Sequence, residues 1–147
     1  MPGFSVCSGL VMSTSAIKRI GIAVVEHAGR YLIGIRGPDI PLAGYAEFPG
    51  GKCLADESPE DCAVRECHEE SGLFVTVDRR LLRREHSYPH ATVDLYFILC
   101  RPTEAASVSD EHQGFRWVPR EQLASLKFPE ANAPLIEMLN REARRVS

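Results

Sequence analysis

The sequence predicts an α+β fold in which a mixed β-sheet lies between helices. Short segments rich in β-branched and aromatic residues alternate with turns that contain glycine or proline, and this pattern is typical of strands. Two longer segments, one in the middle of the chain and one at its end, carry apolar residues at helical spacing. Because a helix must bury its apolar side, we expect these two helices to flank the sheet.

The chain has 147 residues, which is enough for one domain with a sizeable core. We expect residues 17–147 to form this domain and residues 1–16 to form a disordered tail. The tail lacks the basic start and the long apolar run of a signal peptide. Translation from Met1 and translation from Met12 both remain open.

The composition excludes several classes of function. The net charge is −3 and no long basic run occurs, which argues against a nucleic-acid polymer as the partner. No apolar run is long enough to span a membrane. The five cysteines form no C-x-x-C pair, which favours reduced thiols in the cytoplasm over disulfides or zinc. The sequence carries no signal for an oligomeric state.

The strands are expected in chain order as follows. Residues 18–26 are apolar and β-branched, a turn follows, and residues 30–36 return as a second strand. Residues 92–100 form the clearest strand, with Asp94 as its one charge. The other strand segments are 46–48, 73–77, 81–85 and 114–118.

The central helix has the clearest boundaries. Ser58 is expected as its N-cap, Pro59 as its first residue and Gly72 as the residue just past its end, which makes a helix of roughly 13 residues. A short helix is expected at 119–126 and a last helix at about 132–144.

One face of the central helix is acidic. At about 100° per residue, Ala63 and Cys67 point to the core, whereas Glu66, Glu69 and Glu70 share another face. Carboxylates at this spacing repel one another. Oxygen-rich clusters suit hard ions such as Mg²⁺ or Mn²⁺, although a solvated acidic face is the simpler interpretation of three glutamates alone.

The stretch from 51 to 73 resembles the Nudix box, G-x5-E-x7-R-E-U-x-E-E-x-G-U, in which U is a bulky apolar residue. Leu73 fits the last apolar position, and Cys67 at the first is a mild departure. The resemblance implies a Nudix-type α/β/α sandwich and hydrolysis of a nucleoside diphosphate derivative. The fixed positions are occupied by Gly51, Glu57, Arg65, Glu66, Glu69, Glu70 and Gly72.

The resemblance also implies roles for these residues. Glu57 would support the loop, and Arg65 would orient the neighbouring carboxylates. The ligands of Mg²⁺ or Mn²⁺ would be the Gly50 carbonyl, Glu66, Glu69 and Glu70. A non-catalytic Nudix-fold binding module is the less favoured alternative, because such modules typically lack box carboxylates and all of them are present here.

Two segments outside the box are similar to the MutT-like branch, the enzymes that cleanse the nucleotide pool. Glu47 and Phe48 begin a Glu-Phe-Pro-Gly-Gly-Lys lead-in, and residues 128–132 read Phe-Pro-Glu-Ala-Asn. The resemblance implies that Asn132 contacts a purine base, although a helix cap is also open to it. Ala46 departs from the bulkier apolar residue of many relatives.

The resemblance assigns two further residues. Arg36 would lie near the nucleotide, together with Glu47, Phe48 and Asn132. Glu111 would add a metal ligand or base, with Asp110 as the alternative in that register.

The implied reaction is metal-dependent hydrolysis of a nucleoside triphosphate to the monophosphate and pyrophosphate, with 8-oxo-dGTP preferred. Another nucleotide derivative (CTP or dCTP, ADP-ribose or a dinucleoside polyphosphate) is the alternative substrate. The partner is therefore expected to be a small nucleotide.

Overall fold

The computed structural model describes residues 17–146, with side chains through residue 142. The expected tail, residues 1–16, lies outside this range. Within it the strands are β1 (Lys18–His27), β2 (Arg30–Ile35), β3 (Ala46–Glu47), β4 (Gly50–Lys52), β5 (Val75–Tyr88), β6 (Ala91–Pro102), β7 (Glu111–His112) and β8 (Phe115–Pro119). The helices are α2 (Pro59–Ser71) and α3 (Ala133–Val146), with 3-10 turns η1 (Ala105–Ser107), η2 (Arg120–Ser125) and η3 (Glu130–Asn132).

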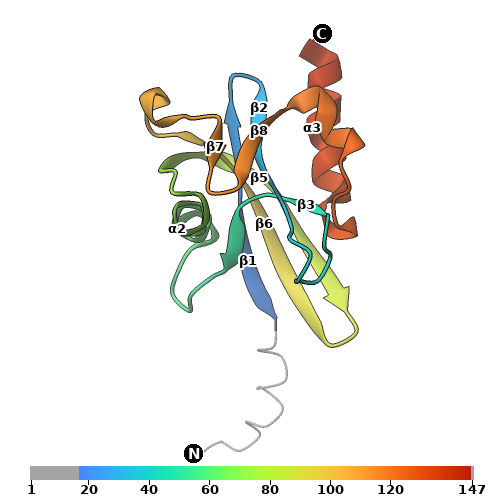
Figure 1. Ribbon diagram of the computed structural model, residues 1–147. Helices are drawn as coiled ribbons and strands as arrows, with labels where there is room; N and C mark the ends of the chain where they lie inside the picture. The colour runs from blue at the N-terminus through green and yellow to red at the C-terminus, as the bar shows by residue number, and fades with distance from the viewer. Residues whose placement is uncertain (1–16, 147) are drawn as a thin grey trace, which may run out of the picture.

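The eight strands of the described residues form one mixed sheet in the order β5-β6-β1-β2-β8-β7 (Figure 1). β3 pairs with β2 and β4 pairs with β1, so both short strands lie off this path. β1 runs parallel to β6, and the other pairs are antiparallel. The predicted mixed sheet is confirmed.

The two long helices cover opposite faces of the sheet (Figure 1). Ala23 and Val25 of β1 pack with Ala63 and Cys67 of α2, whereas Val24 between them packs into the cluster that contains Leu135 of α3. This alternation follows from the two-residue period of a strand. The result is the predicted α/β/α sandwich. No helix in the described part of the chain is long and apolar enough to cross a membrane.

Three expected elements differ in the structure. Residues 73–77 and 81–85 belong largely to one strand, β5, whose register shifts between Val77 and Arg79 and again between Arg80 and Leu82. These bulges interrupt the alternation of side chains, which is why the sequence shows two segments. The helix at 119–126 is the 3-10 helix η2. The strands β4 and β7 were not predicted, because two or three residues carry no periodic pattern.

Candidate active site

Helix α2 begins and ends where the sequence predicts. The Ser58 hydroxyl accepts a hydrogen bond of 3.0 Å from the Asp61 N–H, and Pro59 is the first helical residue. Gly72 ends the helix in the left-handed region at φ 79°, and its N–H donates to the His68 carbonyl. Because both ends are capped, the register of the glutamates on this helix is fixed.

Glycines let the helix, the loop and β1 approach closely. A Cβ on Gly21 would lie 2.7 Å from the Pro59 carbonyl oxygen, and a Cβ on Gly50 would lie 2.7 Å from the Gly21 carbonyl oxygen. A Cβ on Gly51 would lie 2.4 Å from the carboxyl carbon of Glu66. The Gly50–Gly51 pair therefore makes room for the β1 backbone and for the Glu66 carboxylate.

Arg65 forms hydrogen bonds to two glutamates of the acidic face and to the loop before the helix. Its Nε and Nη2 donate to the two oxygens of Glu57 at 2.7 and 2.8 Å. Its Nη1 donates to Glu66 Oε2 at 3.0 Å and to Glu69 Oε2 at 3.1 Å. Nη2 also donates to the Lys52 carbonyl at 3.2 Å. A single guanidinium thus joins the loop before the helix to two of its glutamates.

Glu57 anchors that loop. One of its carboxylate oxygens accepts a hydrogen bond of 3.0 Å from the Leu54 N–H as well as the contact from Arg65. The hydrogen bonds from Arg65 hold the pKa of Glu57 at about 2, far below its ordinary value. Glu57 is therefore ionised at neutral pH and binds the backbone of the loop at Leu54.

Glu70 is half-buried, as is Glu66, whereas Glu69 is exposed. Glu70 Oε1 accepts a hydrogen bond of 3.3 Å from the Gly50 N–H. Burial raises the pKa of Glu70 to about 7, and the neighbouring carboxylates of Glu66 and Glu47 add to the shift. Carboxylates crowded in this way are relieved by a cation between them, and their oxygens together with a glycine carbonyl are the donor set that hard divalent ions prefer.

Arg36 and Glu47, two of the predicted nucleotide-binding residues, form an ion pair. Arg36 Nη1 lies 2.8 Å from Glu47 Oε1, and Arg36 Nε donates to the Pro41 carbonyl at 2.7 Å. The two residues come from the paired strands β2 and β3 and the loop next to them. Glu47 is thus paired with Arg36, and its negative charge also acts on the carboxyl of Glu70.

Phe48 follows Glu47 directly and packs on the face of the sheet that α3 covers. Its ring is 6% exposed and stacks on Phe128 with centroids 5.3 Å apart. Next to it, the Ala46 N–H donates to the Lys127 carbonyl at 2.7 Å. The lead-in to the box is therefore packed directly against the segment that precedes α3.

Asn132 is the last residue of η3, and its N–H donates to the Pro129 carbonyl. α3 follows directly at Ala133. A helical turn is not the extended conformation that an N-cap residue adopts. The geometry therefore does not favour the helix-cap interpretation of Asn132.

Glu111 belongs to the β7–β8 hairpin, whereas the other predicted ligands belong to α2 and to β4. It is exposed in β7 and pairs with Arg116 across the hairpin. The tip of that hairpin contacts the C-terminal end of α2, where the Gln113 amide would lie 3.0 Å from a Cβ on Gly72. Among the side chains described, no hydrogen bond or ion pair joins Glu111 or Asp110 to a box glutamate. Nor do three or more His, Cys, Asp or Glu side chains of residues 17–142 converge as metal ligands.

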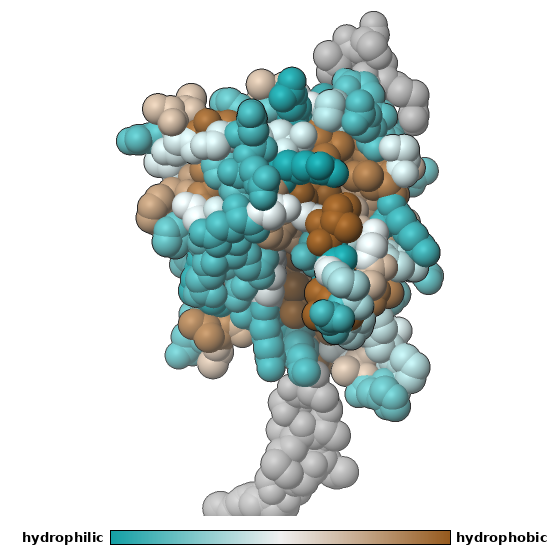
Figure 2. All heavy atoms as spheres, viewed as in Figure 1, coloured by the Kyte–Doolittle hydropathy of each residue, from teal (hydrophilic) through white to brown (hydrophobic). Residues whose placement is uncertain are grey.

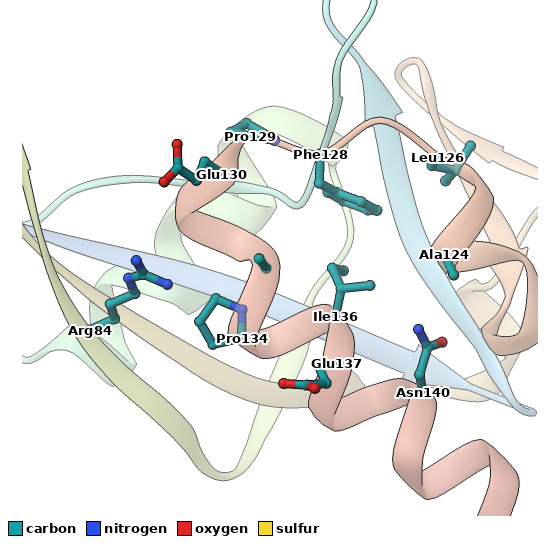
Figure 3. A pocket seen from close by; sticks show the side chains of 11 residues that line it. Arg84, Ala124, Leu126, Phe128, Pro129, Glu130, Pro134, Ile136, Glu137 and Asn140 are labelled. Atoms are coloured by element: carbon teal, nitrogen blue, oxygen red, sulfur yellow. The ribbon is translucent and has the colours of Figure 1, made fainter.

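A cavity of about 760 Å³ lies on the α3 face (Figure 3). It is on the side of the sheet opposite α2, and Phe128 in its wall reaches back to Phe48. Figure 2 shows a largely hydrophilic surface over α2 and hydrophobic atoms in the hollow beside it. A volume of this size accommodates a small molecule such as a nucleoside.

Comparison with known proteins identifies the family. The model of the NUDIX domain matches residues 21–138 of the chain. The chain belongs to the Nudix family. It is 31% identical over 124 residues to the 8-oxo-dGTP diphosphatase of Escherichia coli (strain K12), a match that covers 84% of this chain and 96% of the relative.

Two further proteins match over a similar share of the chain. The CTP pyrophosphohydrolase of Escherichia coli (strain K12) is 30% identical over 124 residues, which are 83% of this chain and 92% of that one. The solution structure of the E. coli ORF135 protein superposes with a TM-score of 0.69 at 28% identity and covers 89% of this chain and 95% of that one. The chain is thus a Nudix hydrolase of the MutT-like group. Nudix hydrolases generally depend on divalent metal ions.

One residue in the cavity of this Nudix hydrolase was not predicted from the sequence. Arg84 of β5 lines the cavity on the α3 face. It is a charged residue in a strand whose bulges disrupt the side-chain alternation, so no periodic pattern assigned it to a face.

Proposed function

We propose that the protein hydrolyses a nucleoside triphosphate to the nucleoside monophosphate and pyrophosphate, with 8-oxo-dGTP as the preferred substrate. The observation that supports this most is the crowding of Glu66 and Glu70 against the Gly50–Gly51 pair, with Glu66 held by Arg65, which in turn binds Glu57. Such an arrangement combines clustered carboxylates with a rigid support for their positions.

Glu66, Glu69 and Glu70, with the Gly50 carbonyl, are proposed to hold Mg²⁺ or Mn²⁺. Such ions neutralise the charge of a polyphosphate and lower the pKa of a bound water that attacks phosphorus. The chain's own part is to keep these oxygens in place. Arg65 fixes the outward oxygens of Glu66 and Glu69, and the Gly50 N–H fixes one oxygen of Glu70. Glu111 is proposed as an additional metal ligand or base.

The nucleoside is proposed to bind beside the Gly50–Gly51 pair, on the side away from the box glutamates. Phe48 and Phe128 form an aromatic wall next to the loop. Asn132 offers both a donor and an acceptor, which suits the paired edge groups of a purine. Oxidation at the 8-position of guanine turns N7 from an acceptor into a donor, so one reversed hydrogen bond separates damaged from normal guanine. Arg36 is proposed to approach the nucleotide from β2, where Glu47 holds it.

The similarity to a CTP pyrophosphohydrolase favours CTP or dCTP as the second candidate substrate. In either case the proposed partner is a small nucleotide, and the proposed site of action is the cytoplasm.

A substrate panel tests the proposal. Wild type and Asn132→Ala are assayed with Mg²⁺ on 8-oxo-dGTP, dGTP, dCTP, CTP and ADP-ribose at equal concentration, and released pyrophosphate is measured. We expect 8-oxo-dGTP to be hydrolysed fastest by the wild type. The preference over dGTP should fall roughly tenfold to a hundredfold in Asn132→Ala, because a lost polar contact to a base costs about 1–3 kcal/mol. Faster turnover of a cytidine nucleotide or of ADP-ribose contradicts the proposed substrate, and an unchanged ratio contradicts the role of Asn132.

A further inference from the structure

Arg84 places a cation on the α3 face of the sheet. In β5 it pairs with Leu95 of β6, whose side chain belongs to the core cluster under α3. Side chains of paired residues point to the same face. Arg84 is accordingly found in the wall of the cavity on the α3 face. Arg80 and Arg83, by contrast, lie over the Tyr96 ring and form bidentate contacts with Glu60 and Asp94.

Glu130 lines the same cavity from η3. Figure 3 shows Arg84 and Glu130 on the same side of the cavity, Arg84 on β5 and Glu130 on the turn before α3. No ion pair within 4.0 Å joins either of them to another side chain among residues 17–142. A third charged residue of the wall, Glu137, is already paired with Arg141 at 3.6 Å. Arg84 and Glu130 therefore leave a donor and an acceptor available to a ligand.

The two side chains have complementary hydrogen-bonding capacity. A guanidinium only donates, and a carboxylate only accepts. Guanine presents the matching pattern on one edge, with the O6 acceptor next to the N1–H and N2–H donors. Adenine reverses it, because an amino group replaces O6 and N1 becomes an acceptor. The same edge is unchanged in 8-oxoguanine.

We propose that Arg84 and Glu130 are specificity-determining residues that read the O6, N1 and N2 edge of a guanine base held in the cavity on the α3 face. Arg84 donates to O6, and Glu130 accepts from N1–H and N2–H. This inference rests on the proposed function and deepens it, since it selects guanine nucleotides over adenine and cytosine nucleotides. Asn132, next to the cavity residue Ala133, is left free to contact the N7 side of the base.

The cavity lies within reach of the proposed phosphate site. Phe128 in its wall stacks on Phe48, and Phe48 is followed by Pro49 and then Gly50, whose N–H binds Glu70. A nucleotide with its base in the cavity therefore directs its polyphosphate towards the glycine pair. The aromatic ring of Phe128 also offers a surface for the base.

The test uses the full chain and five variants. Arg84→Met removes the donors but keeps the length of the side chain, and Arg84→Lys restores one charge. Glu130→Gln replaces an acceptor by an amide. Arg79→Met and Glu121→Gln are matched controls, because both residues are exposed and lie outside this cavity. Thermal unfolding of each variant verifies that it is folded.

Binding of 8-oxo-dGMP, dGMP and dAMP is measured by calorimetry in EDTA, and kcat and KM are measured with Mg²⁺ for the triphosphates. We expect Arg84→Met and Glu130→Gln to weaken binding of the two guanine nucleotides roughly tenfold to a hundredfold and to raise KM more than they lower kcat, because each loses one edge contact. Binding of dAMP should change little, Arg84→Lys should recover part of the loss, and both controls should match the wild type.

The possible failures are distinguishable. If the wild type hydrolyses ADP-ribose but no nucleoside triphosphate, the proposed function itself is wrong. If the wild type prefers 8-oxo-dGTP while Arg84→Met and Glu130→Gln keep the wild-type ratio of guanine to adenine binding, only the roles of Arg84 and Glu130 are wrong.

Discussion

Arg65 donates two hydrogen bonds to the carboxylate of Glu57, from Nε to Oε2 at 2.7 Å and from Nη2 to Oε1 at 2.8 Å. The two residues are eight positions apart, one in the loop before α2 and one in its second turn. The remaining Nη1 reaches Glu66 and Glu69. The Nudix loop and the acidic helix face are thereby held as one unit by a planar group.

Replacing Arg65 by lysine tests this bracing role. Arg65→Lys keeps the charge but cannot reproduce the two-pronged contact, because an ammonium is a point charge. We expect kcat at saturating metal to fall roughly tenfold to a hundredfold, as is usual when a residue that positions metal ligands is lost. Arg30→Lys, an exposed arginine in β2, is the control. Wild-type kcat in Arg65→Lys would show that the bidentate contact is dispensable.

Metal dependence follows from the crowding of carboxylates. EDTA should abolish activity, and Mg²⁺ or Mn²⁺ should restore it. Glu69→Gln and Glu70→Gln should each lower kcat by orders of magnitude while thermal unfolding shows a folded protein. The exposed Glu85→Gln serves as the control. Full activity of either box variant contradicts the assignment of that residue as a metal ligand.

Replacing each of the two glycines before the helix by alanine should affect a different property of the protein. In Gly50→Ala the new methyl meets the rigid backbone at the Gly21 carbonyl, so we expect a loss of about 1–3 kcal/mol in the free energy of unfolding. In Gly51→Ala the methyl meets only the carboxylate of Glu66, the mobile end of a side chain. We therefore expect Gly51→Ala to remain stable but to lose activity, since Glu66 is displaced.

Gly37→Ala is the matched control for this pair, because nothing lies within 4 Å of its added Cβ. Urea unfolding and kcat are measured on all three variants. Equal losses of stability in Gly50→Ala and Gly51→Ala would contradict the distinction between rigid and mobile neighbours.

The ion pair of Asp94 and Arg83 predicts a dependence of stability on pH. Arg83 donates to both oxygens of Asp94 at 2.9 and 2.7 Å, and these contacts lower the pKa of the largely buried Asp94. A carboxyl whose pKa is lower in the folded state stabilises the fold above its unfolded pKa of about 3.9. This contribution is lost as pH falls through the folded pKa.

Asp94→Asn should therefore reduce the free energy of unfolding by about 1–2 kcal/mol at pH 7. The difference from wild type should shrink steadily as the pH falls below about 4. Urea titrations across this range provide the measurement, with the exposed Glu85→Gln as a control. A difference that does not depend on pH would contradict the role of the ionised pair.

The boundaries of α2 could be predicted because its signals are local. Ser58 and Pro59 start it and Gly72 ends it through contacts within one helical turn. The same locality made β1, β2 and β6 predictable from their apolar runs. Bulged β5 was divided in two and β7 was missed, since their form depends on the partner strand more than on their own residues.

The sequence by itself determined the mixed sheet between helices, the membership of the Nudix family and the box residues, because the box spacing places Glu66, Glu69 and Glu70 on one face of one helix. Only the tertiary structure decided that Arg65 joins Glu57 to Glu66, that Glu47 approaches Glu70, and that Arg84 and Glu130 share a cavity. These residues lie far apart in the chain or on bulged strands. Their meeting depends on how the sheet is ordered and on which face each side chain takes, and no local pattern encodes either.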